Sequence, residues 1–403
     1  MTALRIGYSC HDAFPATTTN TQQIFWTTCE VARLGHTIDL RVPALESGGD
    51  DARARIASHY GAAAGVVPDG LRFVADGSRA PSGTAGKAWF DARALWAFSR
   101  RTHDLVWTRD PLALAAALQN RVPAVFETYR PDFASARAFA PWRAATIGHS
   151  RRMGWLGDRR LAGVIAHSAL AADAFVAAGV DRQRVVVAHN GFAPSLMEPR
   201  LSREEARAAA GLPVDRPLLV YAGHVGQQKG TDALMALAAA LPEMRLLIVG
   251  VDHDSAARRW VEDRAARAGA RNIVLVPRVG LRDVARYLYA ADCLIIPPTG
   301  EPLRRYRRTV LPMKVFSYLA AGRPILAPAL PDLEEVLTND GTAVLVPPDD
   351  TAAAVAALRS LLPDEARAAR LSAAALAHSR QFTWEARART IVEAFERWTG
   401  RDA

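Results

Sequence analysis

The segment from Leu218 to Gly230, LLVYAGHVGQQKG, has the residue types of an anion-binding loop. It opens with a continuous apolar run that is short enough for a strand buried on both faces. Glycines at positions 223 and 226 then allow the backbone to turn tightly or to approach a ligand closely. Lys229 stands just before a segment with helical periodicity, 231–241. Free N–H groups and the dipole at such a helix N-terminus favour a phosphate, and Lys229 adds a full positive charge.

This loop matches neither the P-loop pattern nor GxGxxG, so it does not identify the phosphate compound by itself. An ordinary strand-to-helix loop with one solvated lysine is the alternative interpretation. These residues alone do not decide between the two.

The composition is that of a soluble globular protein with more than one domain. The chain has 403 residues, of which 50% are apolar and 23% charged, and this length favours two domains. No apolar run approaches the ~20 residues that span a bilayer. The N-terminus begins directly with a strand-like segment, LRIGYSC, and we expect no signal peptide. Cys10, Cys29 and Cys293 stand singly in apolar stretches and indicate reduced core thiols in a cytoplasmic protein.

The net charge of +9 comes almost entirely from arginine. Two clusters, 304–308 and 151–152, could meet phosphates or anionic lipid, so peripheral contact with the inner face of a membrane stays open. A general preference for arginine over lysine is the alternative explanation. We expect no nucleic-acid partner, because no basic stretch is interleaved with aromatic residues as a single-strand groove requires and no DNA-binding helix motif occurs.

Strand-like and helix-like segments alternate through both halves of the chain. The expected strands are 4–10, 36–43, 71–75, 105–108, 123–128, 163–168 and 185–189 in the first half, and 218–222, 246–249, 273–276, 294–297, 325–327 and 343–346 in the second. Helical patterns between them are typical of crossover units and parallel sheets. The tail, 351–398, is expected to be helical throughout.

The proline-containing segment 192–217 is the predicted connection between two domains. The fold class is therefore α/β, with two doubly wound, Rossmann-like domains. In such sheets ligands bind outside the carboxyl ends of the strands, and we expect the site in the cleft between the domains.

Four segments, in this order, resemble those of the retaining family 4 glycosyltransferases, whose two Rossmann-like domains form the GT-B architecture. They are NTQQIFWTTCEVARLGHTIDLRVP, VIAHSALAADAFVAAGVDRQRVVVAHNGF, YAGHVGQQKG, and LPMKVFSYLAAGRPILAP with the following PDLEEVL and AVLVPPDD. The closing FTWEARARTIVEAFERW resembles the helix that crosses back onto the first domain in this architecture. The resemblance implies an acceptor-binding domain at 1–194, a nucleotide-sugar-binding domain at 195–380 and a C-terminal helix, 381–403, on the first domain.

In the family that the chain resembles, an arginine and a lysine five residues apart bind the donor diphosphate. Here Lys229 occupies the lysine position and His224 the arginine position, directly after Gly223. A histidine near its ordinary pKa of ~6.5 is only partly charged at neutral pH. It can donate a hydrogen bond but not a bidentate fork. A loop histidine without a role is the alternative interpretation of His224.

The family's Glu-x7-Glu pattern falls on Thr309 and Ser317, so both carboxylates are missing. The resemblance implies that Ser317 makes at best one hydrogen bond to a ribose hydroxyl. Lys314 lies one helical turn away and would face the same ligand. Glu301, in the loop TGEP, could supply a carboxylate, although a solvated loop residue needs no function.

On the acceptor domain, the resemblance places Tyr129 where the family often has a histidine. Strand alternation puts Glu127 on the same face. A tyrosine can hydrogen-bond a sugar hydroxyl but does not act as a base near neutral pH, and packing at a strand end is the alternative for both residues. In the first loop, Thr18, Thr19 and Asn20 replace a Gly-Gly pair, so side-chain groups of Thr19 and Asn20 would meet the donor phosphate.

The resemblance implies transfer of a sugar from a nucleotide diphosphate donor to a hydroxyl of a glycan, lipid-linked or small-molecule acceptor, with retention of configuration. It implies neither a cofactor nor a metal, although Asp252-His253-Asp254 has the Asp-x-Asp form that binds a metal–diphosphate in another glycosyltransferase architecture. Two alternatives stay open. One is a catalytically degenerate relative, because motif positions have changed, and the other is a nucleotide-sugar epimerase of the same architecture.

Overall fold

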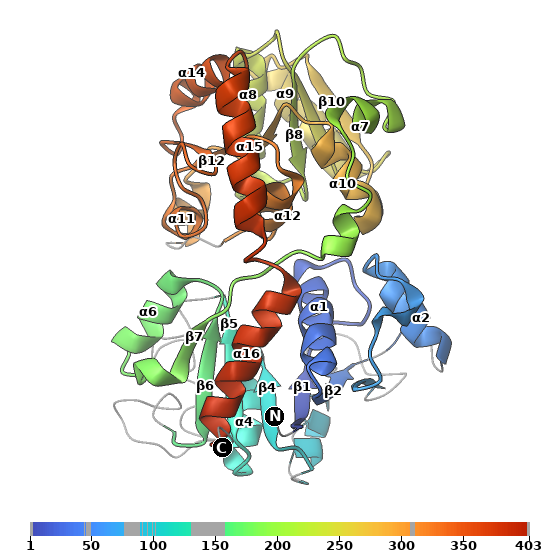
Figure 1. The fold of residues 1–403 in the computed structure, drawn as a ribbon, viewed down its shortest axis with the longest axis vertical. Helices are drawn as coiled ribbons and strands as arrows, with labels where there is room; N and C mark the ends of the chain where they lie inside the picture. The colour runs from blue at the N-terminus through green and yellow to red at the C-terminus, as the bar shows by residue number, and fades with distance from the viewer. Residues whose placement is uncertain are drawn as a thin grey trace. The chain divides into compact units, whose positions relative to one another are not determined.

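The computed structural model describes residues 3–43, 45, 50–75, 89, 90, 92–94, 96–98, 100, 102–129, 158–306 and 311–400. The chain divides into two compact units. The first comprises Met1–Asn190 together with Trp384–Ala403, and the second comprises Gly191–Thr383 (Figure 1). Within the described residues, no helix has both the length and the apolar character required to cross a bilayer.

The first unit is built on a parallel sheet of seven strands. These are β1 (Arg5–Ser9), β2 (Thr37–Val42), β3 (Leu71–Ala75), β4 (Leu105–Thr108), β5 (Ala124–Thr128), β6 (Leu161–Ala166) and β7 (Val185–Val187), in the order β3-β2-β1-β4-β5-β6-β7. Its helices include α1 (Thr19–Arg33), α2 (Asp50–His59), α4 (Pro111–Gln119) and α6 (Ala169–Ala177), and residues 89, 90, 92–94 and 96–98 are also helical. Every residue of β4 and β5 is buried, as expected for parallel strands covered on both faces.

The second unit has a parallel sheet of six strands. These are β8 (Leu218–Ala222), β9 (Arg245–Val249), β10 (Ile273–Val276), β11 (Cys293–Ile295), β12 (Ile325–Pro328) and β13 (Val344–Val346), in the order β10-β9-β8-β11-β12-β13. Its helices include α7 (Arg203–Ala209), α8 (Thr231–Ala240), α9 (Ala256–Ala268), α10 (Leu281–Tyr289), α11 (Glu301–Tyr306), α12 (Lys314–Ala321), α13 (Pro331–Glu334), α14 (Thr351–Leu361) and α15 (Glu365–Ser379). Each strand of both units overlaps one of the predicted apolar runs, so the predicted α/β alternation is confirmed.

The two sheets share one topology. In each, the first strand of the unit lies between the second and the fourth, so β1 pairs with β2 and β4, and β8 pairs with β9 and β11. The strand order reverses at β1/β4 and at β8/β11. In doubly wound sheets ligands bind outside the carboxyl ends of the strands at such a reversal. A ligand site is therefore expected at the loops that follow these four strands.

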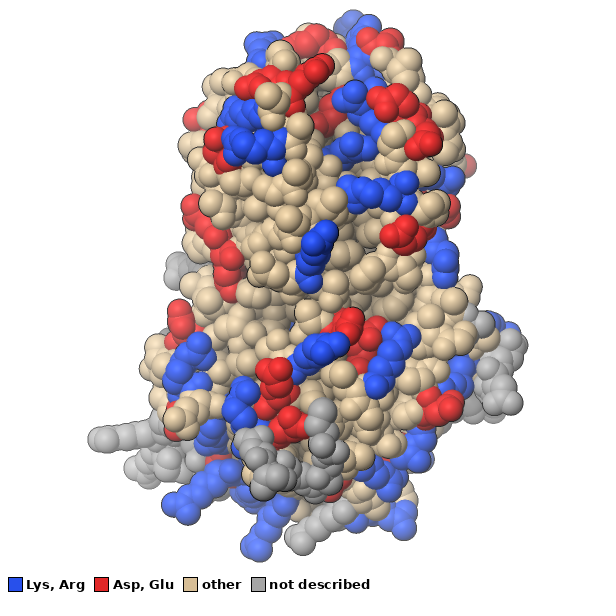
Figure 2. Space-filling view, viewed as in Figure 1, with Lys and Arg blue, Asp and Glu red and all other residues tan. Residues whose placement is uncertain are grey.

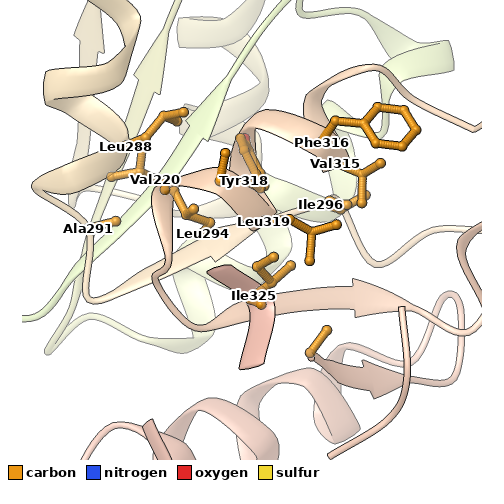
Figure 3. Close-up of a cluster of buried hydrophobic side chains, with 14 of the residues drawn as sticks. Val220, Leu288, Ala291, Leu294, Ile296, Val315, Phe316, Tyr318, Leu319 and Ile325 are labelled. Atoms are coloured by element: carbon orange, nitrogen blue, oxygen red, sulfur yellow. The ribbon is translucent and has the colours of Figure 1, made fainter. Parts of the chain in front are cut away.

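Successive residues of β8 enter different apolar clusters. Val220 is buried with Leu294, Val315 and Leu319 in one cluster, which Figure 3 shows, whereas Tyr221 belongs to another. This alternation is what a strand buried on both faces produces. Because the apolar side of α12 packs into the first cluster, the polar side chains of its first turn are set beside the end of β8.

The C-terminal tail is not one continuous helix, and that prediction was wrong. α14 ends before Leu362, α15 begins after Asp364, and α16 (Trp384–Thr399) begins only after Thr383. Pro363 cannot continue a helix, and the Asp364 side chain caps α15 by accepting a hydrogen bond from the Arg367 N–H at 2.9 Å. The second break leads the chain out of the second unit.

α16 returns to the first unit, as predicted. It lies beside α1 in Figure 1, and the Phe395 ring centroid is 5.4 Å from that of Trp107 on β4. The Trp398 indole N–H donates to the backbone oxygen of Gln183 at 2.9 Å. The first unit is therefore assembled from both ends of the chain.

Candidate functional site

The connection from β8 to α8 depends on three glycines. Gly223, Gly226 and Gly230 have φ angles of 140°, 151° and 75°, which residues with a Cβ rarely adopt. Thr231 holds the loop closed, because its Oγ1 accepts a hydrogen bond from the Gly226 N–H at 2.9 Å and donates one to the Gly226 oxygen at 3.1 Å. The loop exposes Lys229 directly before the N-terminus of α8.

The loop after β11 packs directly against this first loop. A Cβ at Gly230 would lie 2.6 Å from both Pro297 Cβ and Thr299 Cγ2, so the two loops touch where residue 230 has no side chain. Asp349 braces the second loop by accepting hydrogen bonds from Thr299 Oγ1 at 2.9 Å and from the Gly300 N–H at 3.1 Å. Together the two loops form the carboxyl edge of the sheet at the strand reversal.

Lys314, at the start of α12, lies against the β8–α8 loop. Its Nζ is 3.5 Å from the ring centroid of Tyr221, and a Cβ at Gly223 would come within 2.8 Å of that Nζ. Gly223 therefore leaves room for the ammonium group. Burial, and after it the charge of Lys229, lowers the pKa of Lys314 well below its ordinary value. An anion bound here would relieve both effects.

His224 and Arg278 extend this positive cluster. The Tyr221 hydroxyl fixes the loop by donating a hydrogen bond to the His224 backbone oxygen at 2.6 Å. Partial burial, followed by the charges of Arg278, Lys229 and Lys314, lowers the pKa of His224. Arg278 could not be predicted from the sequence, because it follows a different strand, β10, and no motif marks it.

Asp252 has a structural partner in this part of the second unit. Its Oδ1 accepts a hydrogen bond from the Arg278 N–H at 2.8 Å, and its Oδ2 is 3.9 Å from the Arg278 Nε. The described residues contain no group of three or more His, Cys, Asp or Glu side chains that could hold a metal ion. Asp252 thus connects the loops after β9 and β10.

The other donor-side candidates occupy the same edge of the sheet. Ser317 lies one turn after Lys314, and its hydroxyl donates to the Lys314 backbone oxygen at 3.0 Å. Glu301 begins α11, and its Oε2 accepts a hydrogen bond from the Arg304 Nη2 at 3.0 Å. Thr309 lies outside the described residues. Ser317 keeps lone pairs for a ligand, whereas the Glu301 carboxylate already has a cationic partner.

In the first unit, Glu127 is the centre of a buried polar network. Its Oε1 accepts hydrogen bonds from Gln23 Nε2 at 2.7 Å and from Arg387 Nη2 at 2.6 Å, and it lies 2.7 Å from His167 Nε2. Burial alone would raise the pKa of Glu127, but the charge of Arg387, followed by the hydrogen bond from His167, lowers it below its ordinary value. The sequence pattern did not indicate Arg387, which belongs to α16.

Tyr129, Thr19 and Asn20 lie at the carboxyl edge of the first sheet. The Tyr129 side chain is 40% exposed, and the Arg109 guanidinium carbon is 5.5 Å from its ring centroid. Thr19 and Asn20 are the first residues of α1, and Asn20 Nδ2 donates to Asp12 Oδ2 at 2.6 Å. These side chains belong to the first unit, whereas Gly223, His224, Lys229, Lys314 and Ser317 belong to the second.

Charges of both signs are spread over the visible face of the molecule in Figure 2, and no single basic surface dominates that face. The net charge of +9 is thus not gathered there. The basic groups at the end of β8 form a local cluster, which is the kind of arrangement that binds a small anion.

The second unit resembles a known family. Residues 216–364 match the family model described as glycosyl transferases group 1. The second unit is similar to glycosyl transferases of group 1 over these residues. The matched residues include the β8–α8 loop, Lys314 and Ser317, whereas Glu127, Tyr129, Thr19 and Asn20 lie outside the match.

Relatives of this chain include a D-inositol 3-phosphate glycosyltransferase from Xylanimonas cellulosilytica, which is 34% identical over 231 residues. That alignment covers 55% of this chain and 54% of the relative, so the chain spans about half the length of this curated relative.

Solved structures show that the fold extends over the whole chain. Sucrose-phosphate synthase from Thermosynechococcus elongatus has a TM-score of 0.73 at 18% identity, covering 99% of this chain and 100% of that one. HepE from Anabaena, in complex with UDP and glucose, has a TM-score of 0.67 at 17% identity, covering 98% and 99%. The predicted GT-B architecture of two Rossmann-like domains is confirmed.

Proposed function

We propose that the chain is a glycosyltransferase that moves a sugar from a nucleotide diphosphate donor to an acceptor hydroxyl, with retention of configuration. The observation that carries this proposal is the cluster of Lys229, Lys314 and His224 beside the N-terminus of α8, at the strand reversal of the second sheet. The group 1 family match supports the same reaction.

The basic cluster would act on the leaving group. As the glycosidic bond breaks, negative charge develops on the departing nucleoside diphosphate. Cations and N–H groups that are already in place stabilise this charge without reorganising. Lys229 and Lys314 would supply positive charge, and His224 would donate a hydrogen bond. The first N–H groups of α8 would add further hydrogen bonds and the positive end of the helix dipole. Ser317 would contact the ribose, and Tyr129 would hydrogen-bond the acceptor.

Uridine diphosphate is the nucleotide to test first, because HepE, which shares the fold, binds UDP and glucose. Turnover should be followed with a UDP-sugar and a panel of glycan, lipid-linked and small-molecule acceptors, in the presence of EDTA. We expect transfer to survive EDTA, because basic side chains and backbone supply the phosphate contacts. Loss of turnover that magnesium or manganese restores would contradict this mechanism. It would favour a metal site at Asp252 and Asp254 instead.

The same assay separates the two alternatives. A degenerate relative would bind nucleotide without transfer or donor hydrolysis. An epimerase would change the sugar of the donor without an acceptor. Neither alternative has an observation of its own in the structure, so glycosyl transfer is the function that the site supports best.

Nucleotide binding is expected to take up protons. The pKa values of Lys314 and His224 are lowered in the free protein, and a bound diphosphate would raise them again. Affinity for UDP should therefore fall as pH rises through these pKa values. Calorimetric titration with UDP in buffers of different ionisation enthalpy measures the uptake directly. Lys314→Met should remove the part of the proton uptake that Lys314 contributes. Equal heats in all buffers at every pH tested would contradict proton uptake by Lys314 and His224.

The first unit, which is proposed to bind the acceptor, also has an exposed face of tryptophan and arginine side chains that would contact a membrane surface. Trp89 and Trp96 are 50% and 60% exposed, and the guanidinium carbons of Arg93 and Arg100 lie 5.9 Å and 4.9 Å from their ring centroids. The spacing i, i+4 and i+7 places Trp89, Arg93 and Trp96 on one side of a helical segment, and Arg100 lies in the turn that follows it. The other side is buried and includes Phe90, Ala94 and Phe98. Tryptophan favours the lipid–water interface and arginine binds phosphate, so this face would contact anionic lipid in a cytoplasmic enzyme at the inner membrane surface.

Vesicle binding tests this face. The protein should co-sediment with vesicles of phosphatidylcholine and phosphatidylglycerol, and less with phosphatidylcholine alone or at high salt. The double variant Trp89→Ala, Trp96→Ala should lose about tenfold or more in partitioning, because each indole contributes buried apolar area. Val214→Ala is the matched control, since Val214 is 72% exposed in the second unit. Equal binding of the double variant would exclude this face as the contact.

A further inference from the structure

Lysine is rare in this chain, and two of its lysines stand at one site. Of the 50 lysine and arginine side chains, only Lys87, Lys229 and Lys314 are lysines. Lys87 lies outside the described residues, whereas Lys229 and Lys314 both belong to the basic cluster at the end of β8. Arginine stays charged in proteins, but an amine can lose its proton and act as a nucleophile. A chain that otherwise uses arginine thus places amines where their different chemistry would count.

Lys314 is held in a partly buried position that disfavours its positive charge. It is the first residue of α12, where the helix dipole presents its positive end. Within the described part of the chain, no acidic side chain pairs with its Nζ, which lies over the face of the buried Tyr221 ring. That ring attracts the ammonium form and so holds the side chain in place. Because Gly223 has no side chain, the Nζ lies directly against the β8–α8 loop.

The charged and titratable groups around Lys314 oppose its protonation. Burial, followed by the charge of Lys229, lowers the pKa of Lys314 well below its ordinary value. His224 and Arg278 belong to the same cluster and add no negative charge. Asp252, in the loop after β9, is paired with Arg278. Lys314 therefore combines the two features that activate a lysine as a nucleophile, which are desolvation and a neighbouring cation.

We propose that Lys314 is a modification site for acyl phosphates, an inference that shares the phosphate site of the proposed function. The phosphate would bind beside Lys229 and the N-terminus of α8. The Nζ lone pair forms a bond to the acyl carbon, and the bond from that carbon to the phosphate oxygen breaks. The electron pair leaves with the phosphate, which also takes the proton that the amine gives up. The products are an amide at Lys314 and inorganic phosphate, so no further reactant is required.

Acylation would switch off nucleotide binding, a consequence that rests on the proposed function. An amide carries no charge, so the cluster would lose one of its cations. Its extra atoms would also occupy the space beside Gly223. A bound diphosphate, in turn, would protonate Lys314 and cover it. Nucleotide binding and acylation would therefore oppose each other to the same extent, as linked equilibria require.

Acetyl phosphate tests the reactivity on the full chain. The protein is incubated with it at about pH 8, together with free Nα-acetyl-lysine as an ordinary amine of pKa ~10.4, and mass spectrometry follows each lysine. Lys314 should react at least about tenfold faster than the exposed Lys229, because it is the desolvated amine and the phosphate is held beside it. Since a lowered pKa leaves the amine neutral at lower pH, the rate at Lys314 should level off with rising pH while that of Nα-acetyl-lysine still increases.

Two further measurements locate the phosphate and the consequence. Inorganic pyrophosphate should slow acetylation of Lys314 without slowing that of Nα-acetyl-lysine. After acetylation, the dissociation constant for UDP should rise at least about tenfold, as expected when a charged hydrogen-bond donor is lost. Lys229→Arg, which keeps a cation but has no amine at this position, should show the same rise. Lys314→Gln, which resembles the acylated side chain, should have the weaker affinity before any treatment.

The outcomes separate this inference from the proposed function. Fast labelling of Lys314, with protection by pyrophosphate and loss of UDP affinity, supports both. A protein that binds UDP but whose Lys314 reacts no faster than Lys229 overturns the modification site alone. Labelling that pyrophosphate does not slow overturns it as well, because the phosphate would then bind elsewhere. Fast labelling that pyrophosphate prevents, in a protein that does not bind UDP, supports the modification site and contradicts UDP as the nucleotide of the proposed function.

Discussion

Replacing Arg387 by alanine is expected to lower the free energy of unfolding by about 3–5 kcal/mol, the range for breaking a buried ion pair. The Arg387 and Glu127 side chains are 1% and 0% exposed, with 2.6 Å between Nη2 and Oε1. The guanidinium also donates to the His189 backbone oxygen at 2.9 Å. Its removal leaves the Glu127 carboxylate buried without its main counter-charge. Urea or guanidinium unfolding, followed by circular dichroism, measures the loss.

Two further variants make this result specific. Arg389→Ala, two residues along α16, removes an arginine whose ion pair with Glu385 lies on the surface, and no measurable change is expected. The double variant Arg387→Met, Glu127→Gln should recover much of the loss, because the uncompensated charge is gone. If Arg387→Ala were as stable as Arg389→Ala, the buried network would not hold α16 in place.

Replacing Lys229 by alanine is expected to weaken UDP binding by roughly 1–3 kcal/mol, the range for a hydrogen bond to a charged group. This corresponds to about a five- to 150-fold higher dissociation constant. The reason is its position, exposed and directly before the N-terminus of α8, where its charge adds to that of Lys314. Calorimetric titration with UDP gives the dissociation constant directly.

Arg267→Ala is the control for Lys229, because Arg267 is an exposed cation of the same unit that pairs with Asp263 on α9. It should leave UDP affinity unchanged, which excludes a general effect of net charge. An unchanged dissociation constant in Lys229→Ala would place the phosphate site elsewhere in the molecule.

The strands of this protein could be predicted from sequence because strands buried on both faces of a parallel sheet consist of continuous runs of apolar residues. The loop at Lys229 could also be predicted, because the positions that need a positive φ are occupied by glycines, which the sequence shows directly. The tail also carried a local signal, Leu362-Pro363-Asp364, which marks the break between α14 and α15. Reading that proline as a helix terminator would have corrected the prediction.

The contacts between distant residues had no such signature. Glu127 and Arg387 are 260 positions apart, and nothing near either residue indicates the other. His11 and Asp110 likewise form an ion pair only because the topology puts β1 beside β4. A buried arginine in an amphipathic helix looks like any surface arginine in the sequence, so its role depends on knowing which element packs against it.

The origin of the first unit in two stretches of chain has a consequence for how the protein is made. On the ribosome, residues 1–190 emerge before the entire second unit, and Trp384–Ala403 emerge after it. Until then, Glu127 lacks the guanidinium that compensates its burial, and the apolar side of α1 lacks α16. The second unit is continuous from Gly191 to Thr383, so all of its residues have been synthesised before those of the first unit are complete. Synthesis from the N-terminus therefore does not dictate the order of folding here: the half that is translated first is completed last.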